Sequence, residues 1–545
     1  MEKIRATLCV VGAGPAGIIT ALEFSHKNPE KKVVLVEFGK KESKGIYKNS
    51  LDESIKFNDP SNLHGVYEST NKGLGGSTLT WGGRCVSYDE VDFLDRPIVN
   101  NGCTWNISIF DDVKKYMERA SFYFESGSPV FNLKEINEFL DFPIADNFIE
   151  GDVTDRCVER WSMPTRFGKK YRQEIEVRSN IVLLEGYEAR DFDAADKEGK
   201  ISSLCIRSKL RELRIEADHF VISSGTQEST RLLLRNKQVF KNLKKVPSAL
   251  GKYYQGHVSG KIASVKFYGN PKNTDYGFIL DKDGVYLRRR FQFSKDYLVA
   301  NNLLNTAIWL DNPLYHKPEH KSGAMSFMYL AMITPFLKDK LAPPAIADSV
   351  TKGHVGDRKK HLINVVQGLP GSIVKPAVIF YKRFLLKRKL PGIFLYSPKN
   401  TYALHFHSEQ VPFEGNQMYL DKDNETLVVD YTLLKNDIES VIKSHKKLDE
   451  YLRQSNCGEL LYWYPKKDLF SKIKNMSRDG IHQSGTTRIG KDEKEGVVDT
   501  DLKVFGTSNL YICSSSVFPT SGQANPTFML GAFAARLSHH LSGKS

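Results

Sequence analysis

The sequence predicts an α/β protein, α+β overall, in which a Rossmann-like nucleotide-binding domain is joined to a second domain on a mainly antiparallel sheet. Residues 6–37 read as strand, glycine turn, helix and strand, which is the order of a parallel βαβ unit. Between residues 256 and 432 the pattern changes to short apolar runs typical of strands. These runs are 259–268, 276–293, 303–310, 402–410 and 427–431.

Length and composition agree with a large globular protein. The 545 residues allow two or three domains, and 40% hydrophobic with 26% charged residues lies outside the ranges of disordered and collagen-like chains. Seven scattered cysteines without a CxxC pair argue against a disulfide framework and against a thiolate metal site. We therefore expect a cytoplasmic, reducing location. Glycines interrupt the apolar run at 7–21, so we expect neither a signal peptide nor a membrane-spanning helix.

The glycine turn carries the first functional prediction. Gly12 permits the tight turn, Gly14 allows the backbone to approach a pyrophosphate, and Gly17 allows close packing of helix on strand. Glu37 follows the second strand, where a carboxylate accepts hydrogen bonds from ribose hydroxyls and repels a 2′-phosphate. The pattern predicts dinucleotide binding and disfavours NADP, while NAD and FAD both stay open.

Further segments extend the nucleotide-binding domain. Residues 72–84 contain five glycines, which offer amide groups and close approach to a flat or anionic ligand. Strands are predicted at 181–185 and 218–225, the second followed by a helix over 228–234. Helical spacing over 438–452 is typical of core packing.

Three C-terminal motifs identify a family. They are GIHQSGTTRIG at 480–490, VDTDLKVFGTSNLYI at 498–512 and SSVFPTSGQANPTF at 515–528. Together with the N-terminal glycine turn and Gly75-Gly76, they resemble the glucose-methanol-choline (GMC) oxidoreductases, particularly the cholesterol-oxidase-like and pyranose-oxidase-like members. The motifs stand at both ends of the chain in the order that the family has.

The resemblance implies an FAD enzyme that oxidises a CH–OH group. His482 matches the histidine of the HxxGTxR motif and is the expected base, and Asn525 matches the second active-site position and is expected to orient the alcohol. Positions expected to contact FAD are Gly12, Gly14, Gly17, Glu37, Gly75, Gly76, Ser77, Thr78, Trp81, Gly82, Ser224, Gly225, Pro526 and Thr527. The resemblance also implies domain boundaries: FAD-binding parts at 1–110, 171–256 and 471–545, an insertion or lid at 111–170, and a substrate domain at 257–470 with a basic insertion at 337–400.

Two departures from the family pattern have consequences. Thr80 stands where pyranose-oxidase-like enzymes can carry the histidine that bonds covalently to flavin, so we expect non-covalent FAD. Gly256 replaces an aspartate in the turn before His257, and we interpret His257 as structural.

Residues 402–410 place His405, His407 and Glu409 on one face of a strand by their spacing of two. Such a triplet could ligate a metal, but three ligands on one strand rarely converge, and we expect no metal. We instead expect His405, His407 and Gln410 to line a polar substrate cavity, which favours a sugar or another polyhydroxylated alcohol over a sterol. Oxygen, a quinone and a carrier protein all remain possible electron acceptors.

The segment 352–389 carries ten Lys and Arg against one Asp, interleaved with apolar residues. Two interpretations stay open: a solvated insertion or lid, and a peripheral contact with an anionic membrane. The net charge of +14 is compatible with nucleic acid, but no recognition module accompanies it, and we expect none to bind. Two alternative functions are an FAD-fold enzyme with non-redox or lyase chemistry, and a membrane-surface binding protein that keeps a vestigial flavin fold.

Overall fold

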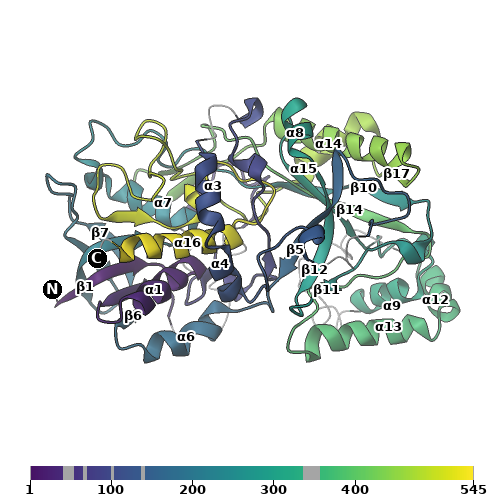
Figure 1. The fold of residues 1–545 in the computed structure, drawn as a ribbon, viewed down its shortest axis with the longest axis horizontal. Coiled ribbons are helices and arrows are strands. Elements are labelled where there is room, and N and C mark those ends of the chain that lie inside the picture. The colour runs from purple at the N-terminus through teal and green to yellow at the C-terminus, as the bar shows by residue number, and fades with distance from the viewer. Residues whose placement is uncertain are drawn as a thin grey trace.

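The computed structural model describes residues 2–40, 54–65, 70–99, 104–136, 142–312, 314–334 and 356–543. Two large sheets lie side by side, one with its helices at the end that carries both termini and the other toward the opposite end (Figure 1). The predicted fold class is confirmed, because a mostly parallel sheet and an antiparallel sheet form the two halves.

The strands are β1 Glu2–Val11, β2 Val33–Glu37, β3 Ile55–Phe57, β4 Arg84–Cys85, β5 Val153–Trp161, β6 Ile181–Glu185, β7 Glu188–Phe192, β8 Ser203–Arg207, β9 Glu212–Ile222, β10 Val258–Phe267, β11 Ile279–Leu280, β12 Tyr286–Phe293, β13 Thr306–Asp311, β14 Thr401–Ser408, β15 Gln417–Leu420, β16 Leu427–Asp430, β17 Gly458–Tyr462 and β18 Leu510–Ile512. The helices are α1 Pro15–Lys27, α3 Ile107–Lys114, α4 Met117–Phe124, α5 Leu133–Ile136, α6 Phe167–Val177, α7 Gly225–Arg235, α8 Lys295–Ala300, α9 Gly323–Met332, α12 Arg358–Gln367, α13 Gly371–Phe380, α14 Lys435–Gln454, α15 Leu469–Met476 and α16 Pro526–Ser542.

The first sheet has seven strands in the order β6-β2-β1-β9-β8-β7, with β18 also paired to β9. Its central strands are parallel, with Val11 of β1 opposite Val36 of β2 and Ile222 of β9. The apolar run of β2 is buried throughout, as expected of a parallel strand that helices cover on both faces. Helix α1 packs against α16, which brings the two ends of the chain together (Figure 1).

The strand predicted at 218–225 ends earlier, at Ile222, and α7 begins at Gly225 rather than at 228. Ser223 and Ser224 end the strand, because both hydroxyls donate to the carbonyl oxygen of Val11, at 3.0 Å each. Gly225 then has a φ of +74°, which turns the chain into the helix.

The second sheet has eight strands in the order β17-β10-β14-β13-β12-β5-β4, with β11 paired to β12. All its pairings are antiparallel, as the strand-like runs predict. The predicted strand at 427–431 lies elsewhere, in a three-stranded sheet of β15, β16 and β3. Its partner β3 comes from the N-terminal part of the chain, which no local pattern indicates.

The region predicted as an insertion at 111–170 contacts both halves. Helix α4 packs on α16, whereas β5 joins the antiparallel sheet. Of the predicted basic insertion at 337–400, residues 337–355 lie outside the described residues, and 356–400 contain α12 and α13. No single helix among the described residues is long and apolar enough to cross a membrane, but α12 together with Gly371–Leu385 passes that test as a pair bent by 92°.

Candidate functional site

A cavity of about 1450 Å³ lies at the carboxyl ends of the parallel strands. This volume exceeds the roughly 300–1,000 Å³ typical of small-ligand pockets, so a dinucleotide and a substrate can share it. Thirteen of the predicted catalytic and cofactor residues line it: Gly12, Gly14, Glu37, Gly76, Ser77, Trp81, Gly82, Ser224, Gly225, His482, Asn525, Pro526 and Thr527.

The glycine turn at the end of β1 shows why each glycine is needed. A Cβ on Gly17 would lie 1.9 Å from the carbonyl oxygen of Gly12, so only glycine lets α1 pack this closely. Gly12 has a φ of +97°, and a Cβ there would lie 2.7 Å from the carbonyl oxygen of Ser223. On Gly14 a Cβ would meet only that same oxygen, at 3.9 Å, and would otherwise project into open space. Gly12 and Gly17 therefore shape the fold, whereas Gly14 leaves room for a ligand.

The Glu37 carboxylate joins three segments at the adenosine end of the cavity. It accepts the amides of Ala13 at 2.9 Å, Gly39 at 2.8 Å and Gly73 at 2.9 Å. A carboxylate offers about four lone-pair positions, so capacity for one further donor, such as a ribose hydroxyl, remains. Burial raises the pKa of Glu37, while the three amide hydrogen bonds oppose that rise.

The second glycine segment lies across the first. The amide of Gly75 donates to the carbonyl oxygen of Ala13 at 2.7 Å, and a Cβ on Gly76 would lie 2.9 Å from the Cα of Gly14. Thr78 Oγ1 donates to the carbonyl oxygen of Gly75 at 2.6 Å, and Trp81 Nε1 donates to that of Thr165 at 3.0 Å. Gly17, Gly75 and Thr78 do not line the cavity, and they support the residues that do.

Three helix N-termini converge on the cavity. Residues 14–16 of α1, 224–226 of α7 and 525–527 of α16 all line it. Each N-terminus carries unpaired amides and the positive end of a helix dipole, which favours anionic ligands. A cradle of glycines, a ribose-accepting carboxylate and these N-termini fit FAD, which carries a pyrophosphate.

His482 and Asn525 meet at the same cavity, although 43 residues separate them. The Asn525 amide nitrogen lies 2.9 Å from His482 Nε2. An amide nitrogen can only donate, so this contact requires a lone pair on Nε2 and places the ring proton on Nδ1. Burial lowers the pKa of the His482 imidazole well below its ordinary value, and the neighbouring His257, Arg84 and His64 lower it further. The ring is therefore neutral and ready to accept a proton at neutral pH.

Asp479 anchors the loop that presents His482, and the sequence did not single it out. Its carboxylate accepts from Tyr254 Oη at 2.8 Å and contacts His64 Nδ1 at 2.6 Å, while its carbonyl oxygen accepts the amide of His257 at 3.0 Å. Ile481 has a φ of +64°, which is a strained conformation for a β-branched residue. The position of Asp479 directly before the motif at 480–490 is the only sequence signal that could have indicated it.

Two more histidines surround His482. The rings of His257 and His407 stack with centroids 4.0 Å apart, and both meet His482 edge-on, at 5.1 and 5.4 Å. One ring nitrogen of each lies within 4.8 Å of the others, the spacing of a possible metal site. Stacked imidazoles direct their lone pairs along parallel planes, however, and these do not converge on one ion. We therefore interpret the cluster as packed neutral rings, and the expected absence of a metal stays a prediction.

Arg84 supplies positive charge beside this cluster. It lines the cavity and pairs with the buried Glu159, which also accepts from Arg288 Nε at 2.5 Å. Its guanidinium lies over Trp309, 4.3 Å from the ring centroid. Burial lowers the pKa of Arg84 to about 10, which still leaves it charged at neutral pH.

The predicted substrate residues, on β14 and just beyond its end, do not line the cavity. His405 stacks on Trp309 at 4.5 Å instead, and His407 donates from Nδ1 to the carbonyl oxygen of Gln523 at 2.9 Å. The Gln410 side chain accepts the amide of Gly256 at 2.9 Å and donates to the carbonyl oxygen of Thr432 at 3.1 Å. None of His405, His407 and Gln410 is among the residues that line this cavity, and their part in a substrate cavity stays a prediction.

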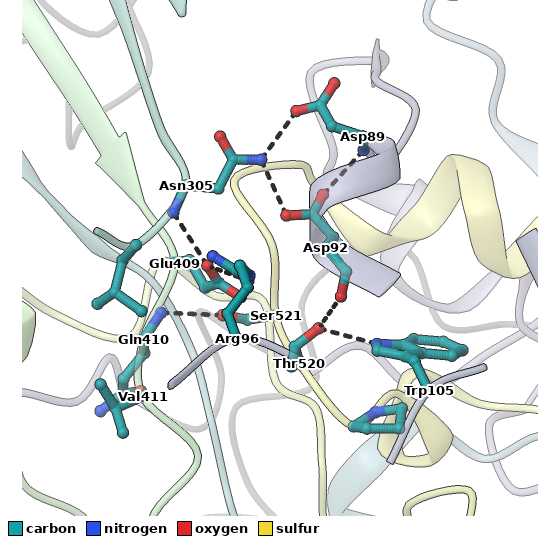
Figure 2. Close-up of polar contacts among 12 residues, drawn as sticks. Asp89, Asp92, Arg96, Trp105, Asn305, Glu409, Gln410, Val411, Thr520 and Ser521 are labelled. Atoms are coloured by element: carbon teal, nitrogen blue, oxygen red, sulfur yellow. Dashed lines mark hydrogen bonds and ion pairs between the residues drawn. The ribbon is translucent and has the colours of Figure 1, made fainter. Parts of the chain in front are cut away.

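Glu409 belongs to a buried polar network rather than to a site (Figure 2). It pairs in bidentate fashion with Arg96 Nη2, at 2.7 and 2.9 Å, and accepts the amide of Asn305 at 2.9 Å. The Asn305 amide group donates to Asp89 at 2.9 Å and to Asp92 at 2.8 Å. These contacts tie the ends of β13 and β14 to the 89–96 segment of the nucleotide-binding half.

Comparisons with known proteins agree with this geometry. Residues 412–534 match the family model described as GMC oxidoreductase. Pyridoxine 4-oxidase from Mesorbium loti has a similar fold, with 14% identity, a TM-score of 0.52 and coverage of 98% of this chain and 99% of its own. Formate oxidase from Aspergillus oryzae RIB40 (14%, 0.52, coverage 100% and 99%) and a fungal aryl-alcohol oxidase (13%, 0.50, coverage 99% and 99%) are also similar. The C-terminal match to the GMC oxidoreductase family and the similarity in fold agree with the resemblance that the motifs indicate.

Proposed function

We propose that the protein is an FAD-dependent oxidoreductase that oxidises a CH–OH group. The observation that carries the proposal is the 2.9 Å contact between His482 Nε2 and the Asn525 amide, in a cavity whose other walls suit a dinucleotide. The names of the similar structures, pyridoxine 4-oxidase and aryl-alcohol oxidase, support the same class of donor.

His482 and Asn525 have separate proposed roles in the oxidation of the alcohol. An alcohol is a poor hydride donor until its proton leaves, and the neutral His482 ring can accept that proton at Nε2. The Asn525 amide can donate to the alcohol oxygen and stabilise the negative charge that develops there. Arg84 adds positive charge, which favours the same oxygen anion and disfavours protonation of His482 before substrate binds.

FAD bound in this cavity would supply the acceptor for the hydride. Gly14 and the α1 amides would hold its pyrophosphate, Glu37 its ribose, and Gly76, Ser77, Trp81 and Gly82 the segment beyond. Non-covalent binding is part of the proposal. Thr80 lines the cavity, and its hydroxyl accepts a hydrogen bond from Asn71 at 2.9 Å.

The proposed substrate is a sugar or another polyhydroxylated alcohol. The residues that support this proposal are not those that the sequence indicated. His64, Arg84, Arg478 and Gln483 line the cavity around His482 and offer donors and acceptors to several hydroxyls. Oxygen, a quinone or a carrier protein would reoxidise the flavin. A cytoplasmic location stays a proposal, consistent with six cysteines that are free among the described residues. The non-redox and vestigial alternatives are not favoured, because both reacting side chains are retained and in contact.

The test is an anaerobic absorbance screen of the purified protein. Sugars, glycosides, polyols, sterols and simple alcohols are added in turn, and loss of the oxidised flavin band identifies the donor. Readmission of air then separates an oxidase from a dehydrogenase. We expect His482→Ala to retain FAD and to slow flavin reduction by about 10²–10⁴-fold, the usual contribution of a general base.

His26→Ala is the matched control, because His26 is an exposed histidine at the end of α1 and lies outside the cavity lining. It should reduce at the wild-type rate. Wild-type reduction rates in His482→Ala would show that the base assignment is wrong. A protein that takes up no FAD would overturn the proposed function as a whole.

A further inference from the structure

The surface of α12, α13 and the π-helical turn Tyr381–Leu385 is unusually apolar. We call it the α12–α13 surface and restrict it to the described residues 358–389. Of the 28 large hydrophobic side chains that are exposed among the described residues, eleven lie within 362–385. They are Leu362, Ile363, Val366, Leu369, Ile373, Val374, Val378, Phe380, Tyr381, Phe384 and Leu385.

The two helices are inverted relative to those of a water-soluble domain, which turn polar residues outward. The buried side chains are His361 and Asn364 on α12, and Ser372 and Pro376 on α13. Asn364 donates to the carbonyl oxygen of Pro318 at 2.8 Å, and Ser372 donates to that of Val365 at 2.8 Å. Asn364 thus attaches α12 to the protein body, Ser372 joins α13 to α12, and the exposed apolar side chains point away from the body.

Basic side chains flank this apolar face. Arg358, Lys359 and Lys360 are exposed at the start of α12, and Lys382, Lys387 and Lys389 are exposed at or beyond the π-helical turn. Asp357 is the one acidic residue within 356–389. Apolar and aromatic residues between clusters of Lys and Arg suit the boundary between the acyl chains and the headgroups of an anionic membrane.

A lid over the cavity does not explain the surface. None of the described residues 356–400 is among those that line the cavity. Helices α12 and α13 instead pack on α9, at the end of the molecule opposite the termini (Figure 1). A partner bound to the α12–α13 surface would therefore not block the cavity.

We propose that the α12–α13 surface binds the protein to an anionic phospholipid bilayer as a peripheral, interfacial contact. The two arms meet at 92°. At about 1.5 Å per residue, neither arm reaches the roughly 30 Å of the hydrocarbon core, so the pair lies in the interface rather than across it. The apolar side chains enter the outer acyl region and the lysines contact lipid phosphates. This inference is independent of the proposed reaction.

The test is flotation of the purified full-length protein with phosphatidylcholine vesicles, with or without about 30% phosphatidylglycerol. The wild type should float with the anionic vesicles and lose binding as salt is raised. The triple variant Leu362→Ser, Val366→Ser, Leu385→Ser should bind roughly 100-fold more weakly, because it removes apolar groups that would enter the bilayer. All three side chains are at least 55% exposed, so the fold should persist, as circular dichroism and the melting temperature would verify.

The matched control removes three exposed apolar side chains elsewhere. Ile149, Val177 and Leu210 are 64%, 71% and 95% exposed, and Ile149→Ser, Val177→Ser, Leu210→Ser should float like the wild type. Loss of flotation in this control would refute the assignment to one surface.

Charge reversal tests the lipid chemistry. Lys359→Glu, Lys382→Glu, Lys387→Glu should reduce binding to anionic vesicles by roughly 100-fold. Equal wild-type binding to neutral and anionic vesicles would overturn the anionic requirement. A wild type that stays unbound to both, and that sediments as a dimer which the apolar variant dissociates, would overturn the proposal and assign the surface to a second copy. None of these readouts needs turnover, so the proposed function can fail without affecting them.

Discussion

Gly14→Ala separates ligand binding from folding at the glycine turn. Gly14 has a φ of −72° and a ψ of −177°, a conformation that alanine adopts readily. A Cβ there would be 3.9 Å from the carbonyl oxygen of Ser223, which is ordinary contact. The apoprotein should therefore keep its stability, or gain about 0.4–1 kcal/mol from the lower entropy of the unfolded chain.

The affinity for FAD should fall in Gly14→Ala, although the stability of the apoprotein does not. The first intrahelical bond of α1 joins the amide of Ile18 to the carbonyl oxygen of Gly14 at 3.0 Å, so the amides of Ala16 and Gly17 precede it and are available to a pyrophosphate. A methyl group at position 14 projects toward the ligand and holds it away from these amides. Hydrogen bonds to a charged group contribute about 1.5–3 kcal/mol each. Losing two would weaken FAD binding by about 10²–10⁴-fold.

Gly17→Ala is the matched comparison, three positions along the same helix. Its Cβ would lie 1.9 Å from the carbonyl oxygen of Gly12, so α1 must move away from the turn. Overpacking of this kind costs about 1–3 kcal/mol or more. The apoprotein itself should then melt earlier, and FAD binding should fall with it.

The assay combines two measurements on apoprotein: the melting temperature, and titration with FAD followed by flavin fluorescence. The expected pattern is a stable Gly14→Ala apoprotein with weak FAD binding, beside an unstable Gly17→Ala apoprotein. Wild-type FAD affinity in Gly14→Ala would refute the position we give to the pyrophosphate. Destabilisation of Gly14→Ala as large as that of Gly17→Ala would refute the packing argument.

Two further predictions concern stability. Arg96→Met should lower the free energy of unfolding by about 3–5 kcal/mol, because it leaves the Glu409 carboxylate buried without its bidentate partner; a loss below about 1 kcal/mol in urea unfolding would contradict this. Burial lowers the pKa of His445 to about 4. Between the ordinary pKa of about 6.5 and pH 4, the unfolded chain therefore binds one more proton at this residue than the folded chain does. The free energy of unfolding should fall there by up to about 1.4 kcal/mol for each pH unit that the pH is lowered. His445→Gln should reduce the slope of unfolding free energy against pH between 6.5 and 5 by up to one proton, and an unchanged slope in urea unfolding at several pH values would contradict this.

The sequence was sufficient where one local pattern determines the structure. The glycine turn, β1, α1 and β2 follow from spacing alone, because the turn requires glycine and a parallel strand covered on both faces requires an apolar run. The juxtaposition of His482 with Asn525 came from the family motifs, since nothing local relates residues 43 positions apart.

Such local patterns could not predict which residues line the cavity. Alternation correctly places His405 and His407 on a strand, but it does not say what covers that face of the sheet. Trp309 of β13 stacks on His405, and His257, directly before β10, stacks on His407, so neighbours from other segments pack against both rings on that face. The loop at Asp479 and the Arg84 pair likewise depend on contacts between distant segments.

The network around Glu409 gives the antiparallel sheet a role in positioning Asn525, the proposed partner of His482. Thr520 donates to the carbonyl oxygen of Asp92 at 3.0 Å, and Ser521 accepts the amide of Gln410 at 3.1 Å (Figure 2). These contacts fix the segment that leads directly into Asn525 and α16. The nucleotide-binding half supplies the helix, but the ends of β13 and β14 hold the approach to it. The proposed catalytic pair, His482 and Asn525, therefore depends on the contact between the two halves, and substitutions in this network should alter the geometry of the pair although none of the network residues lines the cavity.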